Sequence, residues 1–182
     1  MGRLSFGSLS IVVALLTGAC GSDEPARDSS QITEPGVDVE PTEAPAYVDD
    51  VLASIDAVES ELGGPQEFFE VTANAQFTNV FVAVEGGAAV VPYLFVDGEL
   101  QPPAPQVDGA SGETFSRDDV DFDPDRVVGV AQAQLSDSTI DSLSVYGTGI
   151  GVTYLLSATS GSGGILDIVV GPDGSVFSVD PV

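Results

Sequence analysis

The chain has 182 residues, of which 29 are aspartate or glutamate, four are arginine and none is lysine or histidine, so its formal net charge is −25. Its single cysteine excludes an intramolecular disulfide. Without histidine or lysine the chain cannot build a Ser-His-Asp triad, a zinc site of the usual ligands or a Schiff base. We therefore expect a protein that is not an enzyme and that uses no metal and no cofactor.

The N-terminal segment has the order of a secretory signal, with one cation, an apolar run and then small residues. The cation is Arg3, the apolar run is residues 9–16, and the small residues end at Cys20. The apolar run is far shorter than the about 20 residues that a bilayer-spanning helix needs. The pattern predicts a signal peptide at residues 1–19.

The end of this segment resembles the lipobox of bacterial lipoproteins, where small residues precede a cysteine that becomes the diacylated first residue of the mature protein. Gly18 and Ala19 match the small positions, and Thr17 stands where leucine is usual. The resemblance implies lipid attachment at Cys20 and a location at the cell membrane, on its extracytoplasmic face. A diacyl group supplies the two chains that stable anchoring needs.

Three other interpretations of the segment are open. Its small residues also suit ordinary signal peptidase, which would release a secreted protein with a free thiol. The apolar run can instead remain as an uncleaved anchor, or Cys20 can be an incidental core residue. We favour the lipoprotein because the cysteine stands where the apolar segment ends.

Residues 20–45 are predicted to form a disordered acidic tether. Acids alternate with prolines there, and few residues are apolar. Such a composition buries too little surface to offset the entropy of the chain. A flexible chain of this length spans about 25–30 Å, and charge repulsion extends it further.

The first folded unit is predicted at residues 46–103. Apolar residues recur at helical spacing over residues 47–62, and Gly63 is expected to cap the helix. Pro92 marks its strand as an edge or a bulge, and Asp97-Gly98 predicts a tight turn. The expected strands are residues 67–73, 76–85 and 88–96.

An irregular linker is predicted at residues 104–122, followed by a second unit at residues 123–182. Asp123 suits a helix N-cap and precedes a proline at the first helical position. The spacing of Ile140 and Leu143 allows this second helix to continue beyond residue 139. The expected strands are residues 144–146, 151–157, 164–170 and 176–179.

The two units correspond at a single offset. Their Asp-Gly turns start at residues 97 and 173, which are 173 − 97 = 76 positions apart. At that offset the helices, first strands, hairpins and last turns align, which indicates a repeated architecture. The aligned pairs are Val51 with Val127, Leu52 with Val128, Phe69 with Val145, Gly87 with Gly163, Leu94 with Val170 and Leu100 with Val176.

One helical stripe covers one face of a small antiparallel sheet. We therefore predict an α+β fold of two tandem α-β-β-β units, joined edge to edge in an antiparallel sheet with two helices on one face. The arrangement looks like the tandem helix-plus-sheet modules of PepSY-like domains and beta-lactamase-inhibitor-like repeats, a resemblance of shape that implies a binding or inhibitory role. The opposite sheet face is expected to be open to water or to a partner. Most aromatic residues on the strands should be core, with one or two on that face; they are Phe77, Phe81, Tyr93, Phe95 and Tyr154.

The acidic run of residues 119–125 resembles the first half of a calcium loop, because carboxylates alternate along it. However, Pro124 stands where the loop needs glycine, and Val130 stands where it needs a bidentate glutamate. We interpret the run as a linker that ends in a helix N-cap, and we assign no metal ligand. A pair of carboxylates could also serve glycoside hydrolysis, but in a chain with 29 acids some pair will always lie at a suitable separation, so this pattern does not indicate an enzyme.

These observations predict a membrane-anchored exported lipoprotein that acts as a non-catalytic binding module at the cell envelope. Its partners are expected to be the membrane, through Cys20, and an envelope protein or other envelope component. The negative charge opposes nucleic acid as a partner. The alternative is a carrier that holds a lipid or other apolar ligand between helices and sheet, which would require an enclosed apolar cavity.

Overall fold

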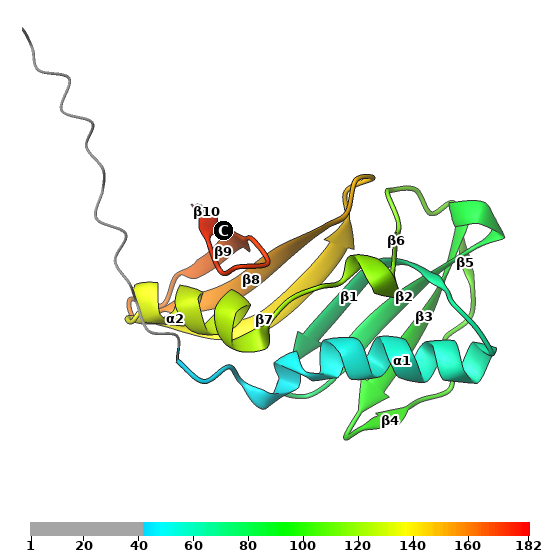
Figure 1. Ribbon diagram of the computed structural model, residues 1–182, viewed down its shortest axis with the longest axis horizontal. Helices are drawn as coiled ribbons and strands as arrows, with labels where there is room; N and C mark the ends of the chain where they lie inside the picture. Colours follow the sequence, from blue (N-terminus) through cyan, green and yellow to red (C-terminus); the bar gives the residue numbers. More distant parts are fainter. Residues whose placement is uncertain (1–41) are drawn as a thin grey trace, which may run out of the picture. The chain divides into compact units, whose positions relative to one another are not determined.

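The computed structural model describes residues 42–182 (Figure 1), so the predicted signal peptide, Cys20 and most of the predicted tether lie outside the described residues. The end of that tether lies on the folded body. The Thr42 hydroxyl donates to the Gly129 carbonyl at 3.3 Å, and the Ala44 N–H donates to the Asp125 carboxylate at 2.9 Å. Residues 42–45 are thus held in place by hydrogen bonds that composition alone does not reveal.

The first unit follows the predicted order of one helix and then strands. A 3-10 turn, η1 (Ala46–Val48), leads into helix α1 (Asp50–Leu62). Gly63 ends the helix in the left-handed conformation, at φ 79°, and its N–H donates to the Glu59 carbonyl at 2.9 Å, which confirms the predicted cap. The strands are β1 (Glu67–Asn74), β2 (Thr78–Val84), β3 (Ala89–Val96) and β4 (Glu99–Leu100), with a 3-10 turn η2 (Glu85–Gly87) between β2 and β3.

Pro92 lies on β3 where that strand is locally an edge. Its Cα partner on β2 is Phe81, and its carbonyl accepts the Ala104 N–H at 2.9 Å on the other side. The nitrogen and carbonyl of one residue point to the same side of an antiparallel strand. The missing N–H of Pro92 therefore faces away from β2, which confirms the predicted edge position.

The prediction of an irregular linker was wrong in part. Strand β5 (Val107–Asp108) pairs with β3, strand β6 (Phe115–Ser116) pairs with β1, and a 3-10 turn η3 (Arg117–Asp119) follows. Phe115 is buried, with its ring centroid 5.8 Å from that of Phe68. Two-residue strands are too short to produce a periodic pattern, so the sequence does not reveal them.

The second helical segment is a π-helical turn η4 (Asp125–Gly129) followed by helix α2 (Val130–Gln134). The Asp123 carboxylate accepts the N–H groups of Asp125 and Arg126 at 3.0 and 3.3 Å, so the predicted N-cap is confirmed.

The continuation of this helix through Ile140 and Leu143 was wrong, because both residues lie in strand β7 (Ser138–Gly147). A β-bulge between Ile140 and Ser142 puts Ile140 and Leu143 on the same buried face, which imitates helical spacing. The remaining strands are β8 (Val152–Ser160), β9 (Ile165–Val170) and β10 (Val176–Pro181).

The strands form one antiparallel sheet in the order β10-β9-β8-β7-β1-β2-β3-β4. The two units join edge to edge, because β1 pairs with β7 from Glu70↔Tyr146 to Asn74↔Ser142. Both helices lie over the same face (Figure 1), and their buried residues share one core cluster with those of the strands. The predicted α+β fold is confirmed.

The repeat is present, but one offset does not describe it. Buried residues that occupy matching positions in the two halves are separated by 76 positions on the second strands, by 72 on the first strands and by 75 on the third. The alignments of Phe69 with Val145 and of Leu94 with Val170 were therefore shifted in register. The matching pairs are Val80 with Leu156, Val71 with Leu143, and Tyr93 with Ile168.

Candidate functional site

The sheet face opposite the helices is the largest candidate surface, and we call it the open face. Along β2 and β8 buried residues alternate with half-buried ones, which is the pattern of a sheet packed on one face only. No helix of residues 42–182 covers the open face (Figure 1). Its central residues are Glu70, Thr72, Asn79, Phe81, Leu94, Ser144, Tyr146, Thr153, Leu155, Ser157 and Val169.

A local two-fold axis crosses the open face where the units join. Thr72 and Ser144 are Cα partners across β1 and β7 and are 144 − 72 = 72 positions apart, the same separation that relates the first strands of the two halves. Equivalent residues therefore face each other at this point. Their hydroxyl oxygens are 2.7 Å apart, so a hydrogen bond links the two units at the axis.

This hydrogen bond belongs to a short polar chain. The Thr72 hydroxyl donates to the Glu70 carboxylate at 2.5 Å, so its one proton is used and Ser144 donates to Thr72. Tyr146 lies opposite Glu70 on β7. Burial raises the pKa of Tyr146, and the charges of Glu70 and Asp167 raise this pKa further, whereas the Ser144 side chain lowers it. Tyr146 therefore keeps its proton to a higher pH than an exposed tyrosine does.

A strap formed by residues 109–114 crosses one end of the open face. It starts directly after β5, where the N–H groups of Gly109 and Ala110 both donate to the carbonyl of Ala88, the residue before β3. A Cβ on Gly112 would lie 3.7 Å from the Phe69 ring, so the strap passes over that ring. Only glycine fits at residue 147, because a Cβ there would lie 2.6 Å from the Glu113 carbonyl.

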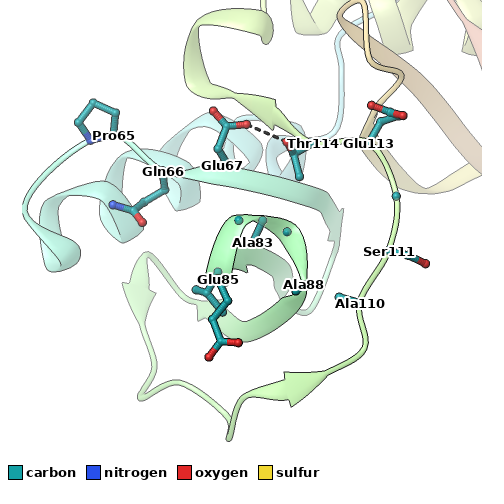
Figure 2. A pocket seen from close by; sticks show the side chains of 14 residues that line it. Pro65, Gln66, Glu67, Ala83, Glu85, Ala88, Ala110, Ser111, Glu113 and Thr114 are labelled. Carbon is teal, nitrogen blue, oxygen red and sulfur yellow. Dashed lines mark hydrogen bonds between the residues drawn. The ribbon is translucent and has the colours of Figure 1, made fainter.

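Two hollows border this strap. The larger has a volume of about 750 Å³ and is lined largely by the η2 turn, the strap and the start of β1 (Figure 2). Its carboxylates are Glu67, Glu85 and Glu113, and the Thr114 hydroxyl donates to Glu67 at 2.9 Å. The smaller hollow, of about 230 Å³, lies on the open face and is lined by Phe69, Glu70, Phe81, Val90, Ala110 and Ser111.

The acidic run of residues 119–125 does not gather into one site. Asp119 accepts the Ser116 N–H and hydroxyl, both at 2.8 Å, and these bonds lower the pKa of Asp119. Asp123 caps the second helical segment, and Asp125 accepts the Ala44 N–H. Within residues 42–182 no group of three or more carboxylate or cysteine side chains is placed to hold a metal ion.

Four of the five aromatic residues are distributed as expected, whereas Phe77 precedes β2 and is exposed. Tyr93, Phe95 and Tyr154 are buried in the core, and Phe81 lies on the open face. The space between helices and sheet is filled by fully buried side chains, among them Ile55 of α1. The largest hollow described above, of about 750 Å³, lies beside the η2 turn and the strap and not between the helices and the sheet. The core therefore gives the carrier interpretation no support.

Both arginines of the described chain lie beside carboxylates away from the open face. The Arg117 Nε is 3.1 Å from the Asp56 carboxylate. Arg126 lies near Asp173, whose pKa is lowered first by hydrogen bonds from Ser175 and also by the charge of Arg126. Residues 42–182 contain 23 acids and only these two arginines, so most carboxylates of the folded part have no cation of the same chain to pair with.

Comparison with known proteins gives one similar structure. No family model and no curated protein matches the chain. A solved structure from Clostridium difficile 630, described provisionally as a lipoprotein, superposes with a TM-score of 0.49 and 10% identity, covering 79% of this chain and 99% of that one.

Within residues 42–182, no helix has the length and apolar character needed to cross a bilayer.

The polar chain of Glu70, Thr72 and Ser144, which lies where the two units join, was not predicted from the sequence. Its members are polar residues at alternate positions, such as Glu70 and Thr72 on β1 and Ser144 and Tyr146 on β7. That alternation predicts which residues share a face, but not that the two strands pair. The site therefore emerges only when the register of β1 against β7 is known.

Proposed function

We propose that this protein is a cell-envelope lipoprotein, anchored through Cys20, whose folded part binds a partner protein through the open face without catalysing a reaction. The observation that carries this proposal is the open face itself. It is formed by both units, has no helix over it, and presents half-buried apolar side chains such as Phe81, Leu94 and Leu155. Apolar side chains beside polar ones are typical of surfaces that bind proteins.

The residue types on the open face support binding in preference to catalysis. The hydroxyls of Thr72 and Ser144 have no histidine or lysine to activate them as nucleophiles. The Glu70 carboxylate accepts a hydrogen bond from the Thr72 hydroxyl, and this bond holds the carboxylate in a fixed position. A fixed carboxylate beside apolar rings is suited to recognition of a complementary group.

The anchor is tested by the substitution Cys20→Ser in the full-length chain. We expect it to move the protein from the membrane fraction to the soluble fraction and to abolish incorporation of labelled palmitate. The matched control, Ser22→Ala, should leave both unchanged. If the Cys20→Ser protein stays in the membrane fraction, the lipoprotein assignment is wrong.

The binding surface is tested by two pairs of matched substitutions. Thr153→Gln with Ser157→Gln enlarges two side chains on the open face, whereas Ala53→Gln with Ser60→Gln makes the same change on the exposed side of α1. Each doubly substituted protein is used to capture partners from envelope extracts. A partner that is lost from the first protein only supports the proposal, and a partner lost equally from both, or from the second alone, refutes it.

A further inference from the structure

The small hollow on the open face combines two aromatic rings with one carboxylate, and this inference rests on the proposed function of that face. Glu70 and Phe81 are Cα partners across β1 and β2, so their side chains lie next to each other. Phe69 occupies the β-bulge between Phe68 and Glu70 and lines the same hollow from the next position. At about 230 Å³, the hollow is smaller than the about 300–1,000 Å³ of small-molecule sites and suits a single side chain.

The carboxylate of Glu70 is prepared for a further partner. It accepts one hydrogen bond, from Thr72, and an ionised carboxylate offers about four acceptor positions. The chain from Ser144 through Thr72 fixes its orientation across the seam of the two units. A fixed carboxylate with free acceptor positions pairs well with a planar guanidinium, which donates two parallel hydrogen bonds.

A cation that pairs with Glu70 in this hollow would come from another molecule. None of the six residues that line the hollow is a cation. The two arginines of residues 42–182 lie beside Asp56 and Asp173. Aromatic faces attract a guanidinium, so Phe69 and Phe81 add to the attraction of the charge.

We infer that the hollow lined by Phe69, Glu70 and Phe81 is the anchor pocket of the open face and receives an arginine side chain of the partner protein. The guanidinium pairs with Glu70 and its aliphatic part contacts the two rings. Recognition at this point is by charge complementarity, because a strongly acidic chain of net charge −25 attracts a cationic partner.

The test is a titration of the full chain carrying Cys20→Ser, followed by backbone amide NMR. The probe is N-acetyl-arginine methylamide, and its matched control is the citrulline analogue, which has the same shape without the charge. We expect the arginine probe to shift the amide signals of Phe69, Phe81 and Ser111 and the citrulline probe to shift them far less. Equal shifts with both probes, or shifts confined to other regions, would overturn the inference.

Substitutions separate the pocket from general electrostatic attraction. Glu70→Gln should weaken binding of the arginine probe about tenfold or more, because a charge-assisted hydrogen bond is lost. Glu99→Gln removes the same charge elsewhere on the sheet and should change affinity less than about twofold. Phe81→Leu keeps an apolar side chain without the aromatic face and should weaken binding about threefold. Equal losses for Glu70→Gln and Glu99→Gln refute the pocket.

The two proposals fail in different ways. If a captured partner is lost after the open-face substitutions at Thr153 and Ser157 but retained by Glu70→Gln, the open face binds and the arginine pocket is wrong. If the arginine probe binds the hollow but no captured partner depends on the open face, the pocket is real and the proposed function is wrong. The amide spectrum of each variant shows whether it is folded.

Discussion

Thr78 provides a sharp test of how the core of this protein is built. It lies on β2 facing the helices, its side chain is fully buried, and its hydroxyl oxygen has no hydrogen-bond partner among residues 42–182. Its Cα partners, Ala73 and Phe95, are buried and apolar. The matching residue of the second unit is Tyr154, whose hydroxyl donates to the Asp121 carbonyl at 3.4 Å. Only the first unit therefore buries a hydroxyl without a partner.

The substitution Thr78→Val replaces this hydroxyl by a methyl group of similar size. An unpaired buried hydroxyl costs about 1–3 kcal/mol, and a buried methyl group adds some hydrophobic stabilisation. We expect the free energy of unfolding to rise by about 1–2 kcal/mol. For a domain of this size the midpoint of thermal unfolding should rise by roughly 2–8 °C.

The assay is urea unfolding followed by circular dichroism, with Thr72→Val as the matched control. Thr72 is on the neighbouring strand, but its hydroxyl bonds to both Glu70 and Ser144. Its loss should lower the free energy of unfolding by about 1 kcal/mol or more. The denaturant slope should be the same for all three proteins. If Thr78→Val destabilises the protein as much as Thr72→Val does, the Thr78 hydroxyl is satisfied and the reasoning is wrong.

Three further predictions concern packing and charge. Gly174→Ala should lower the free energy of unfolding by about 3 kcal/mol or more, because a Cβ there would lie 2.1 Å from the Arg126 carbonyl. Gly98 has a similar positive φ but open space around it, so Gly98→Ala should lower the free energy of unfolding by only about 1–2 kcal/mol. Equal losses for the two variants in urea unfolding would contradict this. Burial and the charge of Asp121 raise the pKa of Tyr154 to about 12. As the pH rises from 10 to 12, the unfolded chain therefore binds fewer protons than the folded chain, and the free energy of unfolding falls by at most about 1.4 kcal/mol per pH unit. Tyr154→Phe should reduce this slope, and an unchanged slope would refute the prediction. Raising the NaCl concentration from 20 to 500 mM should raise the midpoint of thermal unfolding, because salt screens the repulsion within a chain of net charge −25. A lower midpoint would show that this repulsion does not limit the stability of the fold.

Local signals in the sequence predicted the elements that depend on a few adjacent residues. Gly63 predicted the end of α1, and Asp97-Gly98 predicted the turn before β4, where both residues have positive φ. Asp123 predicted the start of the second helical segment through its side-chain hydrogen bonds. In each case the chemistry that fixes the backbone lies within about four residues.

Register was harder to predict because β-bulges change the spacing of buried residues. Ile140 and Leu143 are three positions apart and both face the core, as are Phe68 and Val71 on β1, which has a bulge at the matching place. A spacing of three indicates a helix when bulges are ignored. The repeat has offsets of 72 and 76 positions in neighbouring strands because the second hairpin is longer. Ala73 pairs with Thr78, five positions on, whereas the matching Val145 pairs with Tyr154, nine positions on.

The candidate site depends on contacts between residues far apart in the chain. Thr72 and Ser144 meet only because β1 and β7 pair antiparallel, and the hollow beside Glu70 exists only because the strap of residues 109–114 crosses Phe69. Neither arrangement has a local signal. The sequence therefore predicted an open face, but not the polar chain or the hollow on it.

The central claim, that the open face is the binding surface of an anchored protein, is tested most directly by crosslinking in the intact cell envelope. A photoreactive p-benzoylphenylalanine is placed at position 157 on the open face or at position 60 on α1, with Cys20 unchanged. We predict a discrete crosslinked partner from position 157 and none from position 60. A partner crosslinked from position 60 alone, or equally from both positions, would contradict the account.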